Sequence, residues 1–165
     1  MKNKKEESTI LNKEAEYEYK KFNKTVNHKS DGVTMILRSH LLAEHYLDQL
    51  IGSGIPRGDF VIDNNFTFIQ KLIIVKSLDV IPSYILDSLK NLNTIRNQCV
   101  HVINYKVSEN DIDKIGRPFG NEYSELKLKY LDNFKGLLYR ILMWVIARLS
   151  GHTVRYVKRY LKEEE

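Results

Sequence analysis

The stretch SYILDSLKNLNTIRNQCVHVI, residues Ser83 to Ile103, repeats apolar residues at helical spacing. The preceding Pro82 suits the first turn of a helix, where its missing N–H is not needed. This pattern predicts one amphipathic helix, and the other apolar segments of the chain fit the same period. The residues on its apolar side are Ile85, Leu89, Leu92 and Cys99, with Arg96 in the same row.

Further helices are expected on both sides of this stretch. Ser30 or Asp31 is a good N-cap for a helix over residues 30–51. Gly52 and Gly151 are expected to end helices. Two stretches rich in turn-forming residues, 52–65 and 108–121, are predicted to be loops. The predicted helical segments are residues 12–26, 30–51, 66–80, 83–103 and 122–151.

The absence of any β-hairpin signal makes the expected fold all-α. We predict an up-and-down helical bundle of five or six helices. Residues 1–10 are charged and low in complexity, which is typical of a disordered N-terminus. Residues 11–151 are expected to form a single helical domain, and residues 152–165 an amphipathic basic C-terminal helix or tail.

Composition points to a cytoplasmic protein with no membrane association. Cys99 is the single cysteine, so no intrachain disulfide can form and a reducing compartment is expected. The segment MKNKKEESTI lacks the apolar run of a signal peptide. The most apolar stretch, ILMWVIA at residues 141–147, is far shorter than the roughly 20 residues of a membrane span. A net charge of +5 is a mild bias toward an anionic partner.

Arg96, Asn97 and His101 stand close together near the end of the Ser83–Ile103 helix. Asn97 and His101 are four residues apart and share a helix face, and the long side chain of Arg96 can reach the same space. A histidine transfers protons near neutral pH, and an arginine fork matches a phosphate group. The trio therefore suits cleavage of a phosphodiester. The alternative is that these side chains only cap backbone carbonyls or pair with acidic neighbours.

Other polar residues also have both a functional and a structural interpretation. Glu44 and His45 are candidates for holding Arg96 or His101 from a facing helix, with a solvated polar face as the alternative. Cys99 is interpreted as a small packing residue rather than a nucleophile. The zinc-protease spacing H-E-x-x-H is absent, and no other Cys or His cluster has ligand spacing. No metal site and no cofactor are predicted.

The C-terminal segment HTVRYVKRYLKEEE offers a second candidate surface. Basic side chains interleaved with aromatic ones can bind and stack single-stranded nucleic acid. The alternative is an amphipathic helix that packs Val154, Val157 and Leu161 on the body of the protein and leaves its basic residues solvated. The candidate nucleic-acid-binding residues are Arg155, Lys158 and Arg159, beside Tyr156 and Tyr160.

The motif IRNQCVH, together with its surroundings over residues 30–150, resembles the HEPN superfamily (higher eukaryotes and prokaryotes nucleotide-binding domains). Within it, the chain is similar to the branch of mannitol operon repressor-like proteins. The resemblance implies an all-α domain that dimerises, and in many members a metal-independent endoribonuclease. It gives Arg96 and His101 the catalytic roles and Asn97 an assisting one. A tyrosine found two residues after the histidine in one toxin subgroup is replaced here by Ile103.

Three functions remain open at this stage. The first is a HEPN-type ribonuclease, a toxin or phage-defence effector with RNA as substrate and a cognate antitoxin protein as partner. The second is a non-catalytic regulator or protein-interaction module like those of the repressor-like branch. The third is a structural helical dimer with no role in nucleic-acid binding. A homodimer is expected in each case, and Trp144 and the apolar residues 137–149 are candidates for its interface or for the core.

Overall fold

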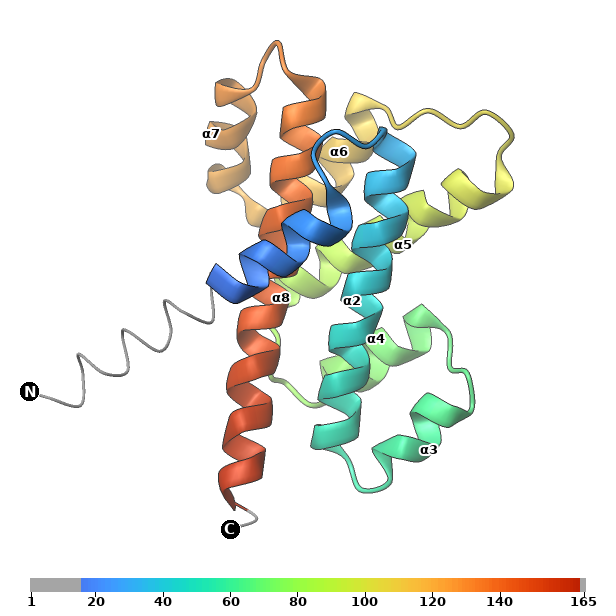
Figure 1. The fold of residues 1–165 in the computed structure, drawn as a ribbon, viewed down its shortest axis with the longest axis vertical. Coiled ribbons are helices and arrows are strands. Elements are labelled where there is room, and N and C mark those ends of the chain that lie inside the picture. The colour runs from blue at the N-terminus through green and yellow to red at the C-terminus, as the bar shows by residue number, and fades with distance from the viewer. Residues whose placement is uncertain (1–15, 164–165) are drawn as a thin grey trace, which may run out of the picture.

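A computed structural model describes residues 16–163 of the chain, with side chains as far as residue 159. These residues form eight α-helices and one short 3-10 helix, and none of them lies in a strand (Figure 1). The all-α prediction is confirmed, whereas the predicted count of five or six helices is wrong. The elements are residues 16–26, α2 (Gly32–Gly54), α3 (Gly58–Asp63), α4 (Phe68–Ser77), α5 (Ser83–His101), α6 (Glu109–Gly116), η1 (Arg117–Phe119), α7 (Asn121–Lys129) and α8 (Phe134–Glu163).

Two of the additional helices lie in the segments that were predicted to be loops. In α6, the Ser108 hydroxyl accepts a hydrogen bond from the Asp111 N–H, and the Asp111 carboxylate accepts one from the Ser108 N–H. This reciprocal capping starts a helix whose Ile112 and Ile115 are buried. The turn-forming residues of this segment therefore cap a helix instead of forming a loop. The short helix α3 also contributes a buried apolar side chain, that of Val61, to the core.

The long helix predicted over residues 122–151 is divided and displaced. A turn over residues 130–133 separates α7 from α8, and the Asn133 side chain accepts a hydrogen bond of 2.8 Å from the Gly136 N–H. At the other end, α8 does not end at Gly151 but continues to Glu163. Thr153, two residues further on, is fully buried, so the packing of residues beyond Gly151 stabilises the continued helix. The predicted helix end at Gly151 is wrong, and the predicted disordered residues 1–10 lie outside the described part of the chain.

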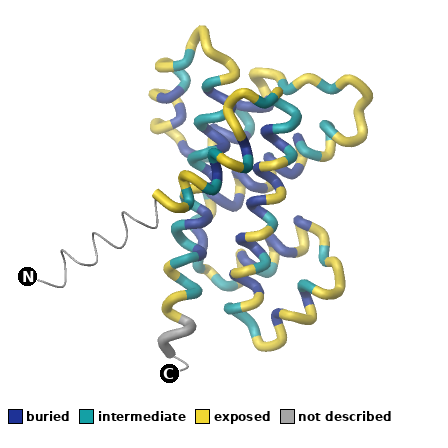
Figure 2. Tube along the Cα trace, in the orientation of Figure 1, coloured by how far each residue is buried: buried dark blue, intermediate teal, exposed yellow. Residues whose placement is uncertain are grey.

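The core forms where α2 packs along α8, with α5 crossing behind them (Figures 1 and 2). The Cα of Gly32 lies close to Leu138, and that of Gly54 lies close to Tyr156, so α2 and α8 run in the same direction. Seven apolar residues of α8 are buried in this core and are unavailable as a dimer interface: Leu137, Leu138, Ile141, Leu142, Val145, Ile146 and Leu149.

Trp144 is half-buried and packs beside Phe119 within the molecule. None of the described helices is long and apolar enough to cross a membrane.

Candidate functional site at the end of helix α5

The C-terminal end of α5 positions the three residues singled out from the sequence. The helix ends where the Val102 N–H binds the Gln98 carbonyl at 3.0 Å, and the chain then turns through Asn104 at a φ of 60°. His101 is thus the last helical residue and is exposed. This end of α5 protrudes at the right of Figure 1, away from the C-terminus of the chain.

Arg96, Asn97 and His101 occupy the exposed edge of this helix end. Arg96 is half-buried and donates from Nη1 to Asn97 Oδ1 at 3.2 Å. Neither Arg96 nor His101 forms an ion pair with a carboxylate of residues 16–159, and the His101 ring makes no hydrogen bond to them. The plain alternative, in which these side chains cap carbonyls or pair with acids, is therefore not what the structure shows.

A buried polar pair lies beneath this edge, between α2 and α5. His40 Nε2 is 3.0 Å from Asn93 Oδ1, which requires that Nε2 carry the proton. The His40 ring also stacks on Phe68 of α4, with the ring centroids 4.2 Å apart. Burial lowers the pKa of His40, and the charges of Arg96 and Lys71 lower it further, against the opposing effects of Asn93 and Glu44. His40 is therefore a neutral ring at pH 7, buried between α2, α4 and α5.

Lys71 of α4 completes the polar layer with two carboxylates of α2. Its Nζ lies 2.9 Å from Glu44 Oε1 and 2.8 Å from Asp48 Oδ1, and only 7% of its side chain is exposed. Burial alone lowers the pKa of Lys71, but the hydrogen bonds and charges of Asp48 and Glu44 outweigh burial and raise it. Glu44 is thus engaged by Lys71 and does not hold Arg96 or His101, contrary to one expectation from the sequence.

His45 and Cys99 take no direct part in the site. His45 is exposed beside Tyr46. Burial lowers the pKa of His45 and the charge of Lys21 lowers it further, against the opposing charges of Asp48 and Glu18, and no residue of α5 contributes. Cys99 is half-buried against the core, and burial, followed by the charge of Asp111, raises its pKa to about 11. A thiol with that pKa is protonated at neutral pH, which agrees with a packing role.

The basic residues of α8 do not form one surface. Arg155 and Arg159 line a cavity of about 350 Å³ together with Asp79, Val80, His152 and Tyr156. Lys158 instead lines a different cavity, with Gln49, Gly52 and Ser53. Val154 and Val157 are half-buried, so this part of α8 packs apolar side chains on the body of the protein and leaves its basic side chains exposed. The side chains of Tyr160 and Leu161 lie outside the described ones.

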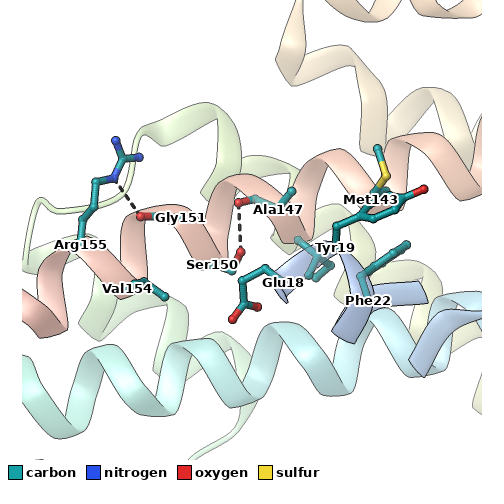
Figure 3. Close-up of a pocket in the computed structure, with 10 residues that line it drawn as sticks. Glu18, Tyr19, Phe22, Met143, Ala147, Ser150, Gly151, Val154 and Arg155 are labelled. Carbon is teal, nitrogen blue, oxygen red and sulfur yellow. Dashed lines mark hydrogen bonds between the residues drawn. The ribbon is translucent and has the colours of Figure 1, made fainter. Parts of the chain in front are cut away.

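An apolar cavity of about 390 Å³ lies between the first helix and α8 (Figure 3). Phe22 and Met143 line its interior, and the Ser150 hydroxyl is bound to the Ala147 carbonyl instead of pointing freely into it. Arg155 leaves α8 on the side away from Glu18. The cavity is apolar and shares no lining residue with α5, so it is separate from the Arg96–His101 edge.

Comparison of the chain with protein-family models, with curated proteins and with solved structures found no match. Within residues 16–159, no group of three or more His, Cys, Asp or Glu side chains is arranged to hold a metal ion.

Four contributors to the site were not singled out from the sequence: His40, Asn93, Phe68 and Lys71. Asn93 stands four residues before Asn97, so extending the polar face of α5 by one turn would have included it. The pairing of Asn93 with His40 joins residues 53 positions apart, and no local pattern signals it. Lys71 gave no signal either, because a lysine in an apolar helix is ordinarily expected to reach solvent.

Proposed function

We propose that the chain is a metal-independent endoribonuclease of the HEPN type. The observation that carries the proposal is the exposed edge of α5, where Arg96 is bound to Asn97 and the His101 ring is not engaged by any described residue. An arginine and a histidine that are not used for internal pairing remain available to an external anion. The buried His40–Asn93 pair joins α2 to α5 one turn before Asn97.

The proposed reaction needs no protein nucleophile. The 2′-hydroxyl of RNA attacks the adjacent phosphorus, the bond to the 5′-oxygen breaks, and the products carry a 2′,3′-cyclic phosphate and a 5′-hydroxyl. One group must accept the proton of the 2′-hydroxyl, and another must donate a proton to the leaving 5′-oxygen. We assign proton transfer to His101, and binding of the phosphate with stabilisation of its developing charge to Arg96. Asn97 orients Arg96 through their hydrogen bond.

A homodimer would supply the second proton-transfer group. We propose that the α5 ends of two copies face each other, so that His101 of the partner subunit takes the opposite role. Three apolar side chains next to His101 support this arrangement because they are unusually exposed: Val100 at 51%, Val102 at 50% and Ile103 at 90%. Burial of such side chains is what stabilises an interface between subunits.

The physiological role proposed with this activity is that of a toxin or phage-defence effector in the cytoplasm, restrained by a cognate antitoxin protein. It is supported by the resemblance of the IRNQCVH motif to HEPN proteins with such roles. An antitoxin that covered the exposed apolar residues around His101 would block both RNA access and dimer formation.

Incubation of the purified protein with total RNA in the presence of EDTA tests the activity. The wild-type chain is expected to cut RNA, and His101→Ala is expected to cut about 10²–10⁴-fold more slowly. His28→Ala is a matched control, because His28 is an exposed histidine in the turn before α2. Equal cleavage by folded wild type and His101→Ala would refute the mechanism, and treatment of the ends with a phosphatase and a kinase would identify the cyclic phosphate.

The second candidate is a non-catalytic regulator or protein-interaction module, resembling the repressor-like branch. The exposed Val100, Val102 and Ile103 favour it as well, because a protein partner would cover them as readily as a second copy. Wild-type protein that binds a defined operator or protein partner and never cuts RNA would establish this function in place of the first.

A further inference from the structure

A strongly polar cavity lies at the other end of the molecule, between the turn that joins α4 to α5 and the C-terminal part of α8. Asp79 and Val80 line it from the turn, and His152, Arg155, Tyr156 and Arg159 line it from α8. The α8 residues are spaced three and four apart, so they share one face of the helix. We infer that this cavity, of about 350 Å³, binds a phosphate group through Arg155 and Arg159.

The two arginines have hydrogen-bonding capacity to spare. Arg155 Nε donates to the Gly151 carbonyl at 2.9 Å, which anchors the side chain and leaves both of its Nη groups without a hydrogen bond to residues 16–159. Arg159 forms no hydrogen bond with residues 16–159, and neither arginine makes an ion pair with Asp79 or any other carboxylate of that range. A planar guanidinium that is not paired matches two oxygens of a phosphate at once.

The charge on this face is unfavourable without an anion. Two arginines four residues apart on one helix face repel each other, and His152 lies one turn before them. Burial lowers the pKa of His152, and the positive charge of Arg155 lowers it further, although its contact with the Val80 backbone opposes this. Among the described side chains, Asp79 is the only carboxylate that lines the cavity, against the two arginines, so these side chains carry an excess of positive charge. A bound phosphate would offset it.

A phosphate here can come from two sources, the backbone of RNA or a free phosphate compound. The C-terminal part of α8, whose residues line the cavity, lies far from the protruding end of α5 (Figure 1). In the RNA case, which rests on the proposed ribonuclease function, the cavity holds a backbone phosphate away from the cleavage point. In the other case, it holds a free phosphate independently of cleavage.

Titration of the full-length protein with inorganic phosphate, followed by NMR of the arginine Nε–H groups, tests the inference at constant ionic strength. Saturable shifts at Arg155 and Arg159 are expected. Arg155→Gln and Arg159→Gln should each weaken phosphate binding about tenfold, because each removes a charged hydrogen-bonding group. Lys158→Gln is the matched control, since it removes the same charge from the same helix but lines a different cavity, and it should change binding by less than about twofold.

Equal weakening by all three variants would show diffuse attraction by net charge and would overturn the inference, as would the absence of saturable shifts. Circular dichroism of each variant confirms that α8 is intact.

A labelled 2′-O-methyl RNA, which cannot be cleaved by 2′-hydroxyl attack, separates the two sources. If the cavity binds the RNA backbone, inorganic phosphate competes with the RNA. Arg159→Gln then lowers the magnitude of the slope of log affinity against log salt concentration by about 1. If RNA binding is unchanged while phosphate binding falls, the cavity takes a free phosphate compound. Both results support the site, and neither depends on cleavage, so a failure of the ribonuclease proposal remains distinguishable.

Discussion

Arg96 is held by a single hydrogen bond to its chain neighbour Asn97, and its guanidinium remains largely free. Arg96→Lys is expected to lower RNA cleavage at least about tenfold, because an ammonium does not replace a planar fork on a phosphate. Asn97→Ala should have the mildest effect of the three motif variants, since the arginine keeps its own charge. Initial rates on one RNA substrate in EDTA measure both. A rate for Arg96→Lys equal to that of wild type would remove the phosphate-binding role.

Asn93 is a buried residue of α5 that accepts the hydrogen bond of His40 in α2. Asn93→Leu leaves the His40 Nε2–H without its acceptor inside the protein, which should lower the free energy of unfolding by about 1–3 kcal/mol. Thr94→Ala, at the adjacent exposed position, should change it by no more than about 0.5 kcal/mol. Urea unfolding at pH 7 compares the two variants. Equal stability of Asn93→Leu and Thr94→Ala would show that the pair is not a structural support.

The lowered pKa of His40 makes stability depend on pH. The unfolded chain takes up a proton at His40 as the pH falls through about 6.5, whereas the folded protein resists it until a lower pH. The contribution is therefore present above pH 6.5 and is lost as the pH falls through the folded pKa. Wild type should lose stability between pH 7 and 5, and His40→Gln should lose less over that range. Urea midpoints at several pH values measure this, and identical losses would contradict it.

At the scale of helices, the sequence predicted most clearly those with long apolar stripes. The apolar side of α5 and its end near His101 were predicted from spacing alone, and both are found. Helix α6 differs from the predicted loop. Ser108 and Asp111 are common in turns, but their three-residue spacing is also that of a reciprocal helix cap. The division between α7 and α8 was missed because no Gly or Pro stands in residues 130–133.

Gly151 was expected to end a helix and instead lies inside one. A Cβ added there would meet only the Arg155 Nη2, at 3.8 Å, so Gly151→Ala should raise the free energy of unfolding by up to about 1 kcal/mol. Gly120→Ala is the opposite control. Gly120 has a φ of 60°, so an added side chain there should lower the free energy of unfolding despite the open space around it. Thermal unfolding distinguishes them. A destabilised Gly151→Ala would mean that α8 ends near residue 151.

At the scale of the whole molecule, the exposed apolar residues beside His101 predict a dimer. Ile103→Glu should convert a dimer into a monomer and reduce RNA cleavage with it, because a buried carboxylate without a partner is strongly unfavourable. Leu131→Glu is the matched control, since Leu131 is also exposed, at 71%, but lies in the turn before α8. Sedimentation at micromolar concentration measures the assembly. A monomeric wild type, or an Ile103→Glu dimer, would contradict the proposed arrangement.

The parallel pairing of α2 with α8 has a consequence for how the chain folds during synthesis. The hydrogen bond from Lys135 to the Lys29 carbonyl joins residues 106 positions apart, and the rest of that helix pair is equally distant in sequence. Such non-local contacts slow folding relative to helical proteins whose neighbours are consecutive. The part of the apolar face of α2 that packs on α8 is therefore expected to stay uncovered until the 30 residues of α8 have left the ribosome, whereas α3, α4 and α5 can pack on α2 earlier. A nascent chain halted before Phe134 is expected to expose the side of α2 that α8 covers in the folded protein.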